Sequence, residues 1–296
     1  MKVKIRIGNE VKEYTGAWED HTLLEVFQEL GITQVHAPCG GNGTCKKCLV
    51  TVEGLGEVLS CQTQCKDGMC VTVAEEQKSA IAENGNCYLY PADAGEGLLA
   101  ACDIGTTTVV CHLLDGATGV RLCTVSAPNA QRSFGADVIS RIQASVDSGL
   151  DKLQSAIVDQ INGMLVQLKQ KAGRTEDIRR LAVAGNTVMS HLFCGLSPES
   201  IGVAPFTPLS LFGESYDAKQ IGIEGCETVY VVPSIAGYVG GDIVADLAAV
   251  QMHSSVLAED GEKETLMLDI GTNGEMVLGK SGSYVCCATA AGPAFG

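Results

Sequence analysis

Four cysteines in the N-terminal part of the chain have a spacing that could hold an iron–sulfur cluster. They follow the pattern C-x5-C-x2-C-x12-C and are Cys39, Cys45, Cys48 and Cys61. Four thiolates can ligate a [2Fe-2S] cluster, which carries single electrons. Glycines between the first two cysteines would let the loop wrap closely around such a cluster and turn backbone N–H groups toward its sulfides.

Two alternatives to this ligand set stay open on spacing alone. A tetrahedral zinc site also takes four thiolates, but it usually draws them from two C-x2-C pairs, and only Cys45 and Cys48 form such a pair here. Cys65 or Cys70 could replace Cys61 as the fourth ligand. Cys61 is favoured because it follows the apolar pair Val58-Leu59 closely, where a strand is expected to end.

A short phrase, Asp-Ile-Gly-Thr, occurs twice and could bind phosphate in each copy. The first copy supplies Asp103, Gly105, Thr106 and Thr107, and the second supplies Asp269, Gly271, Thr272 and Asn273. Apolar runs flank each copy, which predicts a β-hairpin with the phrase at its turn. The glycine would let the backbone approach phosphate oxygens, the hydroxyl and amide groups would donate hydrogen bonds, and the aspartate would hold hydrated Mg²⁺.

Two such turns at the starts of two α/β units predict a cleft that binds a triphosphate from both sides. The alternative is a pair of ordinary β-hairpins with Gly-Thr turns that bind no phosphate. The chain contains neither a Walker-type phosphate loop nor G-x-G-x-x-G after a strand.

Between the two Asp-Ile-Gly-Thr phrases, a glycine pair and Asp242 precede an apolar stretch that is expected to be helical. Asp242 could position an attacking or metal-bound water, or it could cap that helix.

Composition narrows the class of function. The 296 residues carry a formal net charge of -15, which argues against a nucleic-acid partner because phosphate backbones are bound by clustered Lys and Arg. The N-terminus lacks the apolar core of a signal peptide, and acidic residues interrupt the most apolar stretches, so no membrane span is expected. Fourteen cysteines suit a cytoplasmic protein, where thiols stay reduced for metal binding or burial.

The elements that must position the cysteines are expected within a domain at residues 1–76. It opens with two strands and a helix from Thr22 to Leu30, which Thr22 can cap and Gly31 follows. Strands are expected at Cys48–Val52 and Met69–Val73. Residues 77–97 are mostly polar and lack clear periodicity, which predicts a linker.

Alternating strands and helices are expected in the next unit, residues 98–262, and strands of a further layer in residues 263–296. The longest helix would run from Leu150 to Gly173, because five apolar residues recur at helical spacing: Leu153, Ile157, Ile161, Leu165 and Leu168. The other expected elements are strands 98–103, 181–184, 229–232, 265–269 and 275–278 and helices 188–193 and 243–250.

Nearly the whole chain resembles the reductive activators of corrinoid proteins. The resemblance rests on the series Cys39 to Cys61, both Asp-Ile-Gly-Thr phrases, Phe134-Gly-Ala-Asp-Val-Ile-Ser-Arg-Ile142, Ala184-Gly-Asn-Thr187, Ala204-Pro-Phe-Thr-Pro208, Val239-Gly-Gly-Asp242 and Ala291-Gly-Pro-Ala-Phe295. It implies an α+β β-grasp [2Fe-2S] ferredoxin domain, followed by an α/β ribonuclease-H-like ATPase domain of the actin, sugar kinase and Hsp70 superfamily.

The resemblance also implies a function. Such a protein would consume ATP with Mg²⁺ while its cluster, filled by an external electron donor, returns Co(II) to Co(I) on a corrinoid protein or corrinoid-dependent methyltransferase. Asp103 to Thr107 would be the first phosphate motif and Asp269 to Asn273 the second. Asp242 would lie near the segment that connects the two lobes.

The chain departs from that family at its end. Family members continue well beyond the Ala291 to Phe295 motif into a second lobe with an adenosine-binding motif, whereas this sequence stops at Gly296. We therefore expect an incomplete second lobe, weak ATP binding and little turnover in this chain, and normal cluster uptake by the ferredoxin domain. The apolar residues of the 265–278 strands are expected to lie under the missing part.

Two other functions would use the same residues. A plain [2Fe-2S] electron carrier would need only residues 1–76, with the second domain as a docking module, and it would bind no nucleotide. A redox-sensing small-molecule kinase would use both phosphate turns and would phosphorylate a sugar or an acid without reducing a corrinoid.

Overall fold

The computed structural model describes most of the chain. The described residues are 1–8, 10–32, 34, 35, 37, 41–44, 46–74, 95, 97–253, 265–271, 273–280 and 283–290. Two of the predicted cluster ligands, Cys39 and Cys45, lie outside them, as do Thr272 and nearly all of the predicted linker at 77–97.

The N-terminal domain is a five-stranded sheet with one helix packed on it. The strands run in the order β2-β1-β5-β3-β4. Their bounds are β1 Lys2–Ile7, β2 Glu10–Thr15, β3 Leu49–Val52, β4 Gly56–Leu59 and β5 Cys70–Val73, with a 3-10 turn, η1, at Ser60–Gln62. β1 and β5 are parallel, with Ile5 opposite Val71, and the other neighbours are antiparallel. This is the predicted ferredoxin fold.

Helix α1, Leu23–Glu29, starts and ends as the sequence predicted. Thr22 and Glu25 form a capping box, in which each side chain accepts a hydrogen bond from the other's backbone N–H. Gly31 follows the helix with φ +67°, a conformation that glycine adopts without steric cost. Val26 and Phe27 are fully buried against the sheet, and they hold the helix on the domain core.

A six-stranded mixed sheet forms the centre of the next domain, in the order β10-β11-β9-β6-β7-β8. Its strands are β6 Leu98–Ile104, β7 Thr108–Asp115, β8 Arg121–Pro128, β9 Ile178–Gly185, β10 Glu214–Asp217 and β11 Cys226–Val231. β6, β9 and β11 are mutually parallel, and the other pairs are antiparallel. The sequence did not predict β8 or β10, which lie at the two edges of the sheet.

Helices cover this sheet. They are α2 Val138–Ala144, α3 Leu150–Ala172, α4 Thr187–Phe193, α5 Ala218–Ile221 and α6 Gly241–His253, with a π turn at Ser145–Gly149 and 3-10 turns η2 Ala130–Ser133 and η4 Glu199–Ile201. All five apolar residues that predicted α3 are buried, and Gly173 ends the helix with φ +66°. Within the described part of the chain, no helix is long and apolar enough to cross a membrane.

A third sheet consists of β12 Thr265–Ile270, β13 Asn273–Lys280 and β14 Ser283–Ala290, all antiparallel. The sequence predicted the first two strands and not β14. Met267 and Val277 pack against Ile243 of α6, so the expectation that all apolar residues of this hairpin would lie under a missing lobe is wrong for these two. Leu268 and Ile270 are on the other face and are exposed.

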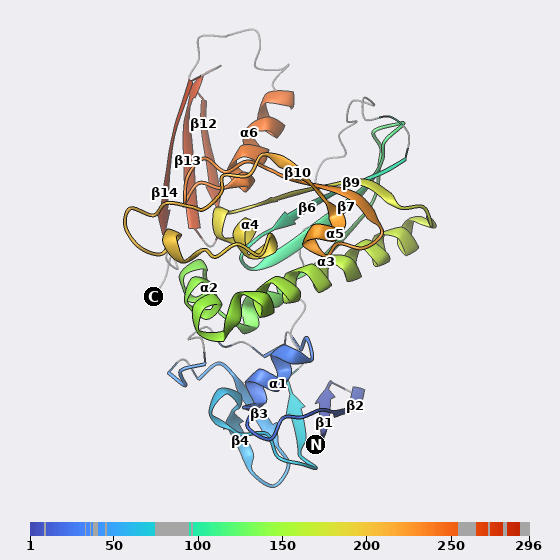
Figure 1. Cartoon of the computed structure of the whole chain (residues 1–296), viewed down its shortest axis with the longest axis vertical. Helices are drawn as coiled ribbons and strands as arrows, with labels where there is room; N and C mark the ends of the chain where they lie inside the picture. Colours follow the sequence, from blue (N-terminus) through green and yellow to red (C-terminus); the bar gives the residue numbers. More distant parts are fainter. Residues whose placement is uncertain are drawn as a thin grey trace.

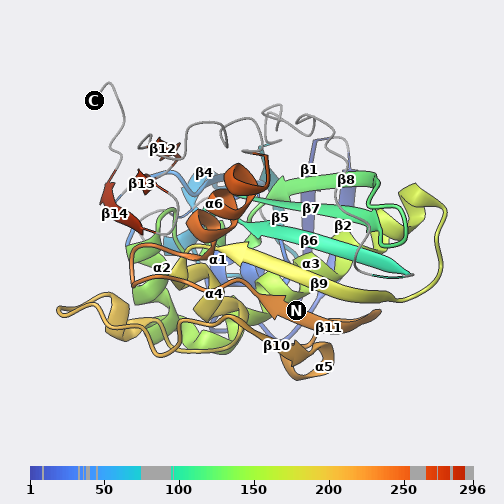
Figure 2. The same cartoon turned by 90° about the horizontal axis from the view of Figure 1, so that it is seen from above.

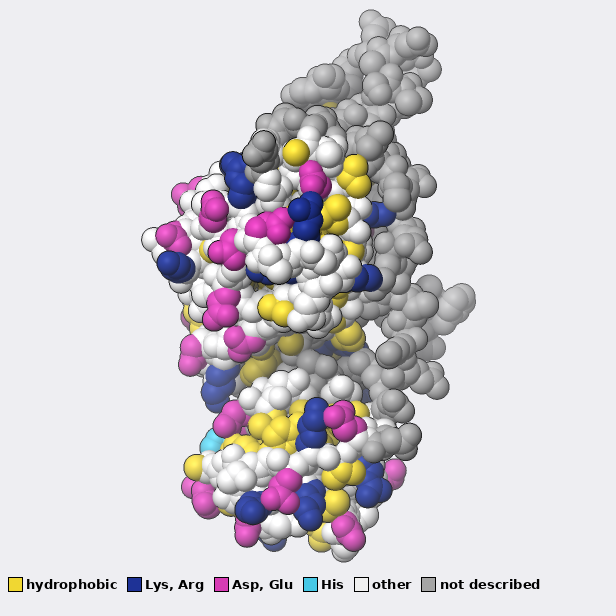
Figure 3. All heavy atoms as spheres, turned by 90° about the vertical axis from the view of Figure 1, so that its right-hand side faces the viewer, with side chains coloured by type: hydrophobic (Ala, Val, Ile, Leu, Met, Phe, Trp, Pro, Cys, Tyr) yellow, Lys and Arg dark blue, Asp and Glu magenta, His cyan; other side chains and the backbone are white. Residues whose placement is uncertain are grey.

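The two domains contact each other through the helical side of the central sheet. Figure 1 shows α2 and α3 between that sheet and the N-terminal domain, and Figure 2 shows α6 on the opposite face. Gln28 of α1 donates a hydrogen bond from Nε2 to the carbonyl of Ser133, at 2.9 Å. In the space-filling view the N-terminal domain is a separate lower body with acidic and basic side chains interspersed on this face (Figure 3).

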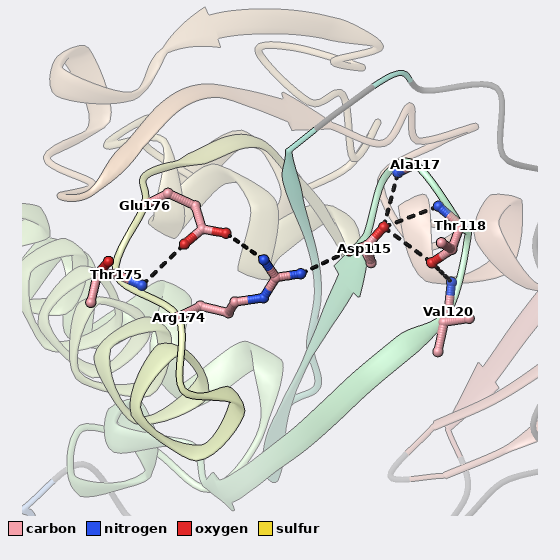
Figure 4. A network of polar contacts seen from close by, with 7 residues as sticks. All are labelled: Asp115, Ala117, Thr118, Val120, Arg174, Thr175 and Glu176. Carbon is pink, nitrogen blue, oxygen red and sulfur yellow. Dashed lines mark hydrogen bonds and ion pairs between the residues drawn. The ribbon is translucent and has the colours of Figure 1, made fainter.

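A polar network fixes the end of the central sheet that is remote from the 105–107 turn (Figure 4). Asp115, at the end of β7, accepts hydrogen bonds from the backbone N–H groups of Ala117 and Thr118. Arg174 joins it to the segment after α3, with 2.8 Å from Nη2 to Asp115 and 2.9 Å from Nη1 to Glu176. The hydrogen bonds from Thr118 and the charge of Arg174 lower the pKa of Asp115.

Candidate functional site

Two of the four predicted cluster ligands lie side by side in the N-terminal domain. Cys48 directly precedes β3 and Cys61 lies in η1, directly after β4. Because β3 pairs with β4 with Leu49 opposite Leu59, both cysteines are at the same end of this hairpin. Their Sγ atoms are 3.3 Å apart and both residues are buried. Cys65 and Cys70, the alternatives on spacing, lie elsewhere: the backbone N–H of Cys65 donates to the carbonyl of His21, and Cys70 begins β5.

The surroundings of Cys61 fit a cluster that accepts hydrogen bonds. Gln62 Nε2 donates to Cys61 Sγ at 3.7 Å and to the carbonyl of Gly41 at 3.1 Å. Ser60 Oγ is fully buried and has no hydrogen-bond partner among the described residues, as expected of a donor whose acceptor is a bound group. Gly41 and Gly43 have φ of +89° and +73°, so the loop there needs glycine.

Without a bound metal, the Cys61 thiol is protonated at neutral pH. Burial, together with the neighbouring Cys48 thiol, raises the pKa of Cys61. Coordination would reverse this, because a metal ion stabilises the thiolate directly. Among the residues with described positions, no three His, Cys, Asp or Glu side chains converge on one point as metal ligands do, and the other two predicted thiolates are outside this set.

The first Asp-Ile-Gly-Thr phrase forms the turn of the β6–β7 hairpin, as predicted. Gly105 has no room for a side chain, since a Cβ there would lie 2.7 Å from the carbonyl oxygen of Thr108. Thr106 is buried, and its hydroxyl accepts a hydrogen bond from Asn186 Nδ2 at 3.1 Å. Asn186 also caps α4, so the turn is fixed to the end of β9, the neighbouring strand.

Asp103 and Asp242 face the same region, although they are 139 residues apart in the sequence. Asp103 is the last residue but one of β6, opposite Ala184 of β9. The glycine pair before Asp242 passes directly over the start of α4, since a Cβ on Gly240 would lie 2.4 Å from Asn186 Cα. Asp242 accepts a hydrogen bond from Ile243 N at 2.9 Å and lies inside the first turn of α6, which begins at Gly241, so it is not the cap of that helix.

The second phrase also forms a hairpin turn, between β12 and β13. Gly271 N donates to the carbonyl of Asn273 at 2.9 Å, which closes the turn. Asp269 lies at the end of β12, directly opposite Glu275 of β13. Its charge acts on both Asp103 and Asp242, so the two phrases contribute to one acidic region.

Burial and, after it, mutual repulsion raise the pKa values of the carboxylates in this region. Enclosure by the protein and the charges of Asp242, Asp246 and Asp269 raise the pKa of Asp103 to about 7, although its side chain stays open to water. Burial and Asp269 raise the pKa of Asp242. A cation would relieve this repulsion. Among the described residues the carboxylates do not converge at ligand distance, so a cation placed between them would keep part of its water shell.

Two acidic residues of this region were not singled out from the sequence. Burial, Asp269 and Asp242 raise the pKa of Asp246 to about 6, and burial, Asp242 and Asp269 raise that of Glu275 to about 7. Asp246 could have been found because it follows Asp242 by four residues, on the same helix face. Glu275 could have been found because a tight hairpin sets it opposite Asp269.

Three family models match successive parts of the chain. Residues 5–76 match a 2Fe-2S iron-sulfur cluster binding domain, residues 98–255 match the RACo middle region, and residues 263–296 match the C-terminal domain of RACo, described as the ASKHA domain.

Two curated relatives and one solved structure are similar to it. The corrinoid activation enzyme RamQ of Eubacterium limosum is 31% identical, over 93% of this chain and 59% of that protein. A protein of Methanosarcina barkeri, named the Co(II) methylated amine-specific corrinoid protein reductase, is 27% identical, over 66% of this chain and 36% of that one. The structure of a reductive activator for a corrinoid, iron-sulfur protein superposes with a TM-score of 0.58 at 29% identity, over 99% of this chain and 64% of that one.

Proposed function

The chain belongs to the RACo family of reductive activators of corrinoid proteins, and from this membership we propose that it takes part in the ATP-dependent reduction of a Co(II) corrinoid to Co(I). It has the family's architecture, an N-terminal 2Fe-2S ferredoxin domain followed by an ASKHA domain. The chain spans about 59% of RamQ and 64% of the solved activator, so the proposal concerns the activity of the whole protein.

We assign Cys39, Cys45, Cys48 and Cys61 as the ligands of a [2Fe-2S] cluster in the domain at residues 1–76. Such a cluster supplies one electron at a potential of roughly -400 mV. The protein's own part is to bury the thiolates, to donate the Gln62 hydrogen bond to Cys61, and to keep water from the Cys48–Cys61 side of the loop. An external donor must restore the electron after each transfer.

The nucleotide half of the proposal uses residues 98–262 and 263–296. The turn of Gly105, Thr106 and Thr107 and the turn of Gly271, Thr272 and Asn273 would bind phosphate oxygens. Asp103, Asp242 and Asp269 would hold hydrated Mg²⁺ and orient the water that attacks the terminal phosphate. The raised pKa values of Asp103 and Asp242 support this role, because grouped carboxylates with perturbed pKa values are typical of functional sites.

One observation carries the coupling of ATP to electron transfer. The short turn η2 contacts both halves: Ser133 O accepts from Gln28 of the ferredoxin domain, and Asn129, which caps η2, donates to Gly105 O in the first phosphate turn. ATP can drive an unfavourable electron transfer only if it binds two conformations differently. A turn that contacts the ferredoxin domain on one side and the first phosphate turn on the other is where such a difference would be transmitted.

The test is anaerobic reduction of a purified Co(II) corrinoid protein, followed by the visible absorbance of Co(I). We expect reduction to need both MgATP and the cluster, so that Cys48→Ala and Asp103→Asn each abolish it and Cys65→Ala does not. Equal reduction without MgATP would refute the ATP requirement and favour a plain electron carrier. Phosphate transfer to a sugar or acid with no Co(I) formed would favour a redox-sensing kinase.

The remaining assignments follow from this activity. The partner would be a corrinoid protein or a corrinoid-dependent methyltransferase, with no nucleic acid or membrane involved. We assign the protein to the cytoplasm, because its thiols need reducing conditions.

A further inference from the structure

Both carbonyl groups at the centre of the first phosphate turn are held from the protein interior. Gly105 O accepts a hydrogen bond from Asn129 Nδ2 at 2.7 Å, and Thr106 O accepts one from Arg141 Nη2 at 2.5 Å. Asn129 and Arg141 are both fully buried. These two side chains come from different elements, the cap of η2 and the middle of α2, so the turn is fixed from two directions.

The anchored carbonyls determine where the neighbouring N–H groups point. In a planar trans peptide the C=O and the following N–H point in opposite directions. Both peptide bonds concerned are trans, since the one cis bond among the described residues is Ala204–Pro205. The N–H groups of Thr106 and Thr107 are therefore directed away from the buried Asn129 and Arg141.

Arg141 also carries a charge into the interior behind the turn. Its Nε donates to Gly135 O at 3.0 Å, and Nη1 lies 3.1 Å from Met189 Sδ. In the described part of the chain, no ion pair joins it to a carboxylate. Burial, and the charge of Arg132, lower the pKa of Arg141 to about 9, so the guanidinium is still protonated at neutral pH. An anion bound at the turn would lie close to this charge.

We propose that Asn129 and Arg141 are positioning residues of the first phosphate turn, which aim the N–H groups of Thr106 and Thr107 at one phosphate group of the nucleotide. The identity of the ligand as MgATP rests on the proposed function. The proposal gives a role to the Phe134 to Ile142 motif, which contributes no residue to the proposed cluster ligands or to the acidic region. Within it, Gly135 leaves room for the Ser140 side chain and supplies the second carbonyl for Arg141, and Asp137 caps α2.

The test compares matched variants of the cluster-loaded protein. Asn129→Ser keeps an oxygen to cap η2 but cannot reach Gly105 O. Its control is Asn162→Ser, because Asn162 likewise donates to a glycine carbonyl and accepts a backbone N–H, at Gly222 and Glu224. Arg141→Met and Arg141→Lys test the guanidinium, with the exposed Arg180→Met as control. Arg180 is five residues before Gly185 on β9, or about 17 Å from that end of the strand.

MgATP affinity is measured by equilibrium dialysis up to millimolar nucleotide, and far-UV circular dichroism with thermal unfolding reports whether the second domain of each variant is folded. We expect Asn129→Ser and Arg141→Met to weaken binding about tenfold or more, Arg141→Lys to recover part of the loss, and both controls to match the parent. If Arg141→Met does not fold, Asn129→Ser decides. Unchanged affinity in Asn129→Ser would overturn the proposal.

A crystal structure of Asn129→Ser separates this inference from the proposed function. The Gly105–Thr106 peptide should have turned, or should be disordered, when its carbonyl has lost the anchor. If the parent binds no MgATP at any concentration, the nucleotide part of the proposed function fails, and the peptide orientation still decides whether Asn129 positions the turn. An unchanged peptide in that structure would overturn the positioning role.

Discussion

Replacing Glu275 with glutamine should stabilise the protein, by an amount that grows with pH. Glu275 is 9% exposed and lies directly opposite Asp269, so ionising it places two negative charges side by side in a partly buried sheet. Burial, Asp242 and Asp269 raise its pKa from 4.5 to about 7. A pKa difference of one between the folded and unfolded chains corresponds to about 1.4 kcal/mol, and solvent screening reduces the total. The expected gain for Glu275→Gln above neutral pH is therefore about 1 to 3 kcal/mol.

The sign follows from proton binding. Between pH 4.5 and about 7 the folded protein holds a proton on Glu275 that the unfolded chain has lost, so the free energy of unfolding of the parent falls as the pH rises through this window. Glu275→Gln removes this contribution. Its advantage over the parent should be near zero at pH 4.5, increase up to about pH 7 and stay constant above.

Urea unfolding followed by circular dichroism, repeated between pH 5 and 8.5, measures this difference, while the visible absorbance of the cluster reports the N-terminal domain separately. Glu227→Gln, at an exposed position of β11, is the control and should change the free energy of unfolding by less than about 0.5 kcal/mol. A gain that is equal at every pH, or absent at pH 8, would refute the charge argument. Saturating Mg²⁺ should reduce the gain, since a cation near Asp242 and Asp269 offsets the repulsion.

Three other predictions concern separate parts of the molecule. Cys48→Ala and Cys61→Ala should remove the visible bands, iron and sulfide of anaerobically produced protein, and Cys65→Ala should keep them; zinc without sulfide would contradict the cluster. Asp103→Asn should lower MgATP-dependent phosphate release by about 100-fold in the full-length parent protein with an unchanged cluster spectrum, and equal release would remove Asp103 from the site. His191 donates from Nδ1 to Thr187 O and accepts from Leu209 N at Nε2, so protonation breaks the second contact. Burial lowers the pKa of His191 from its usual 6.5, so this contact should persist at pH 6.5 and be lost only at a more acidic pH, with faster proteolysis near 209 at pH 5 than at pH 7.5.

The sequence predicted best the elements whose signals are local. Helix α1 has its capping box within four residues, and α3 has an apolar residue at every turn together with a glycine at its end. Both hairpins of the Asp-Ile-Gly-Thr phrases were predicted as well, because a glycine-containing turn between two apolar runs is a local signal for two paired strands.

The edge strands and the supporting residues could not be predicted in the same way. β8, β10 and β14 are each paired on a single side, and half of their side chains face outward, so they lack a strong apolar pattern. The importance of Arg141 depends on contacts with residues 35 and 48 positions away. Contacts between residues so far apart in the sequence leave no local pattern that could reveal them. From the sequence, an arginine in a short helix is expected to be an exposed side chain.

The charges around the first phosphate turn are arranged on two sides. Asp103, Asp242, Asp246 and Asp269 make the cleft side negative, and Arg141 makes the interior side positive. A free triphosphate would be repelled by the carboxylates, so an anion can approach the N–H groups of Thr106 and Thr107 only together with a cation that neutralises the cleft. Among the residues that the structure describes, these carboxylates do not converge at ligand distance, so we expect them to bind such a cation weakly by themselves. We therefore expect nucleotide and metal to bind together at this site, with the phosphate at the turn, where the buried guanidinium favours it, and the metal facing the carboxylates.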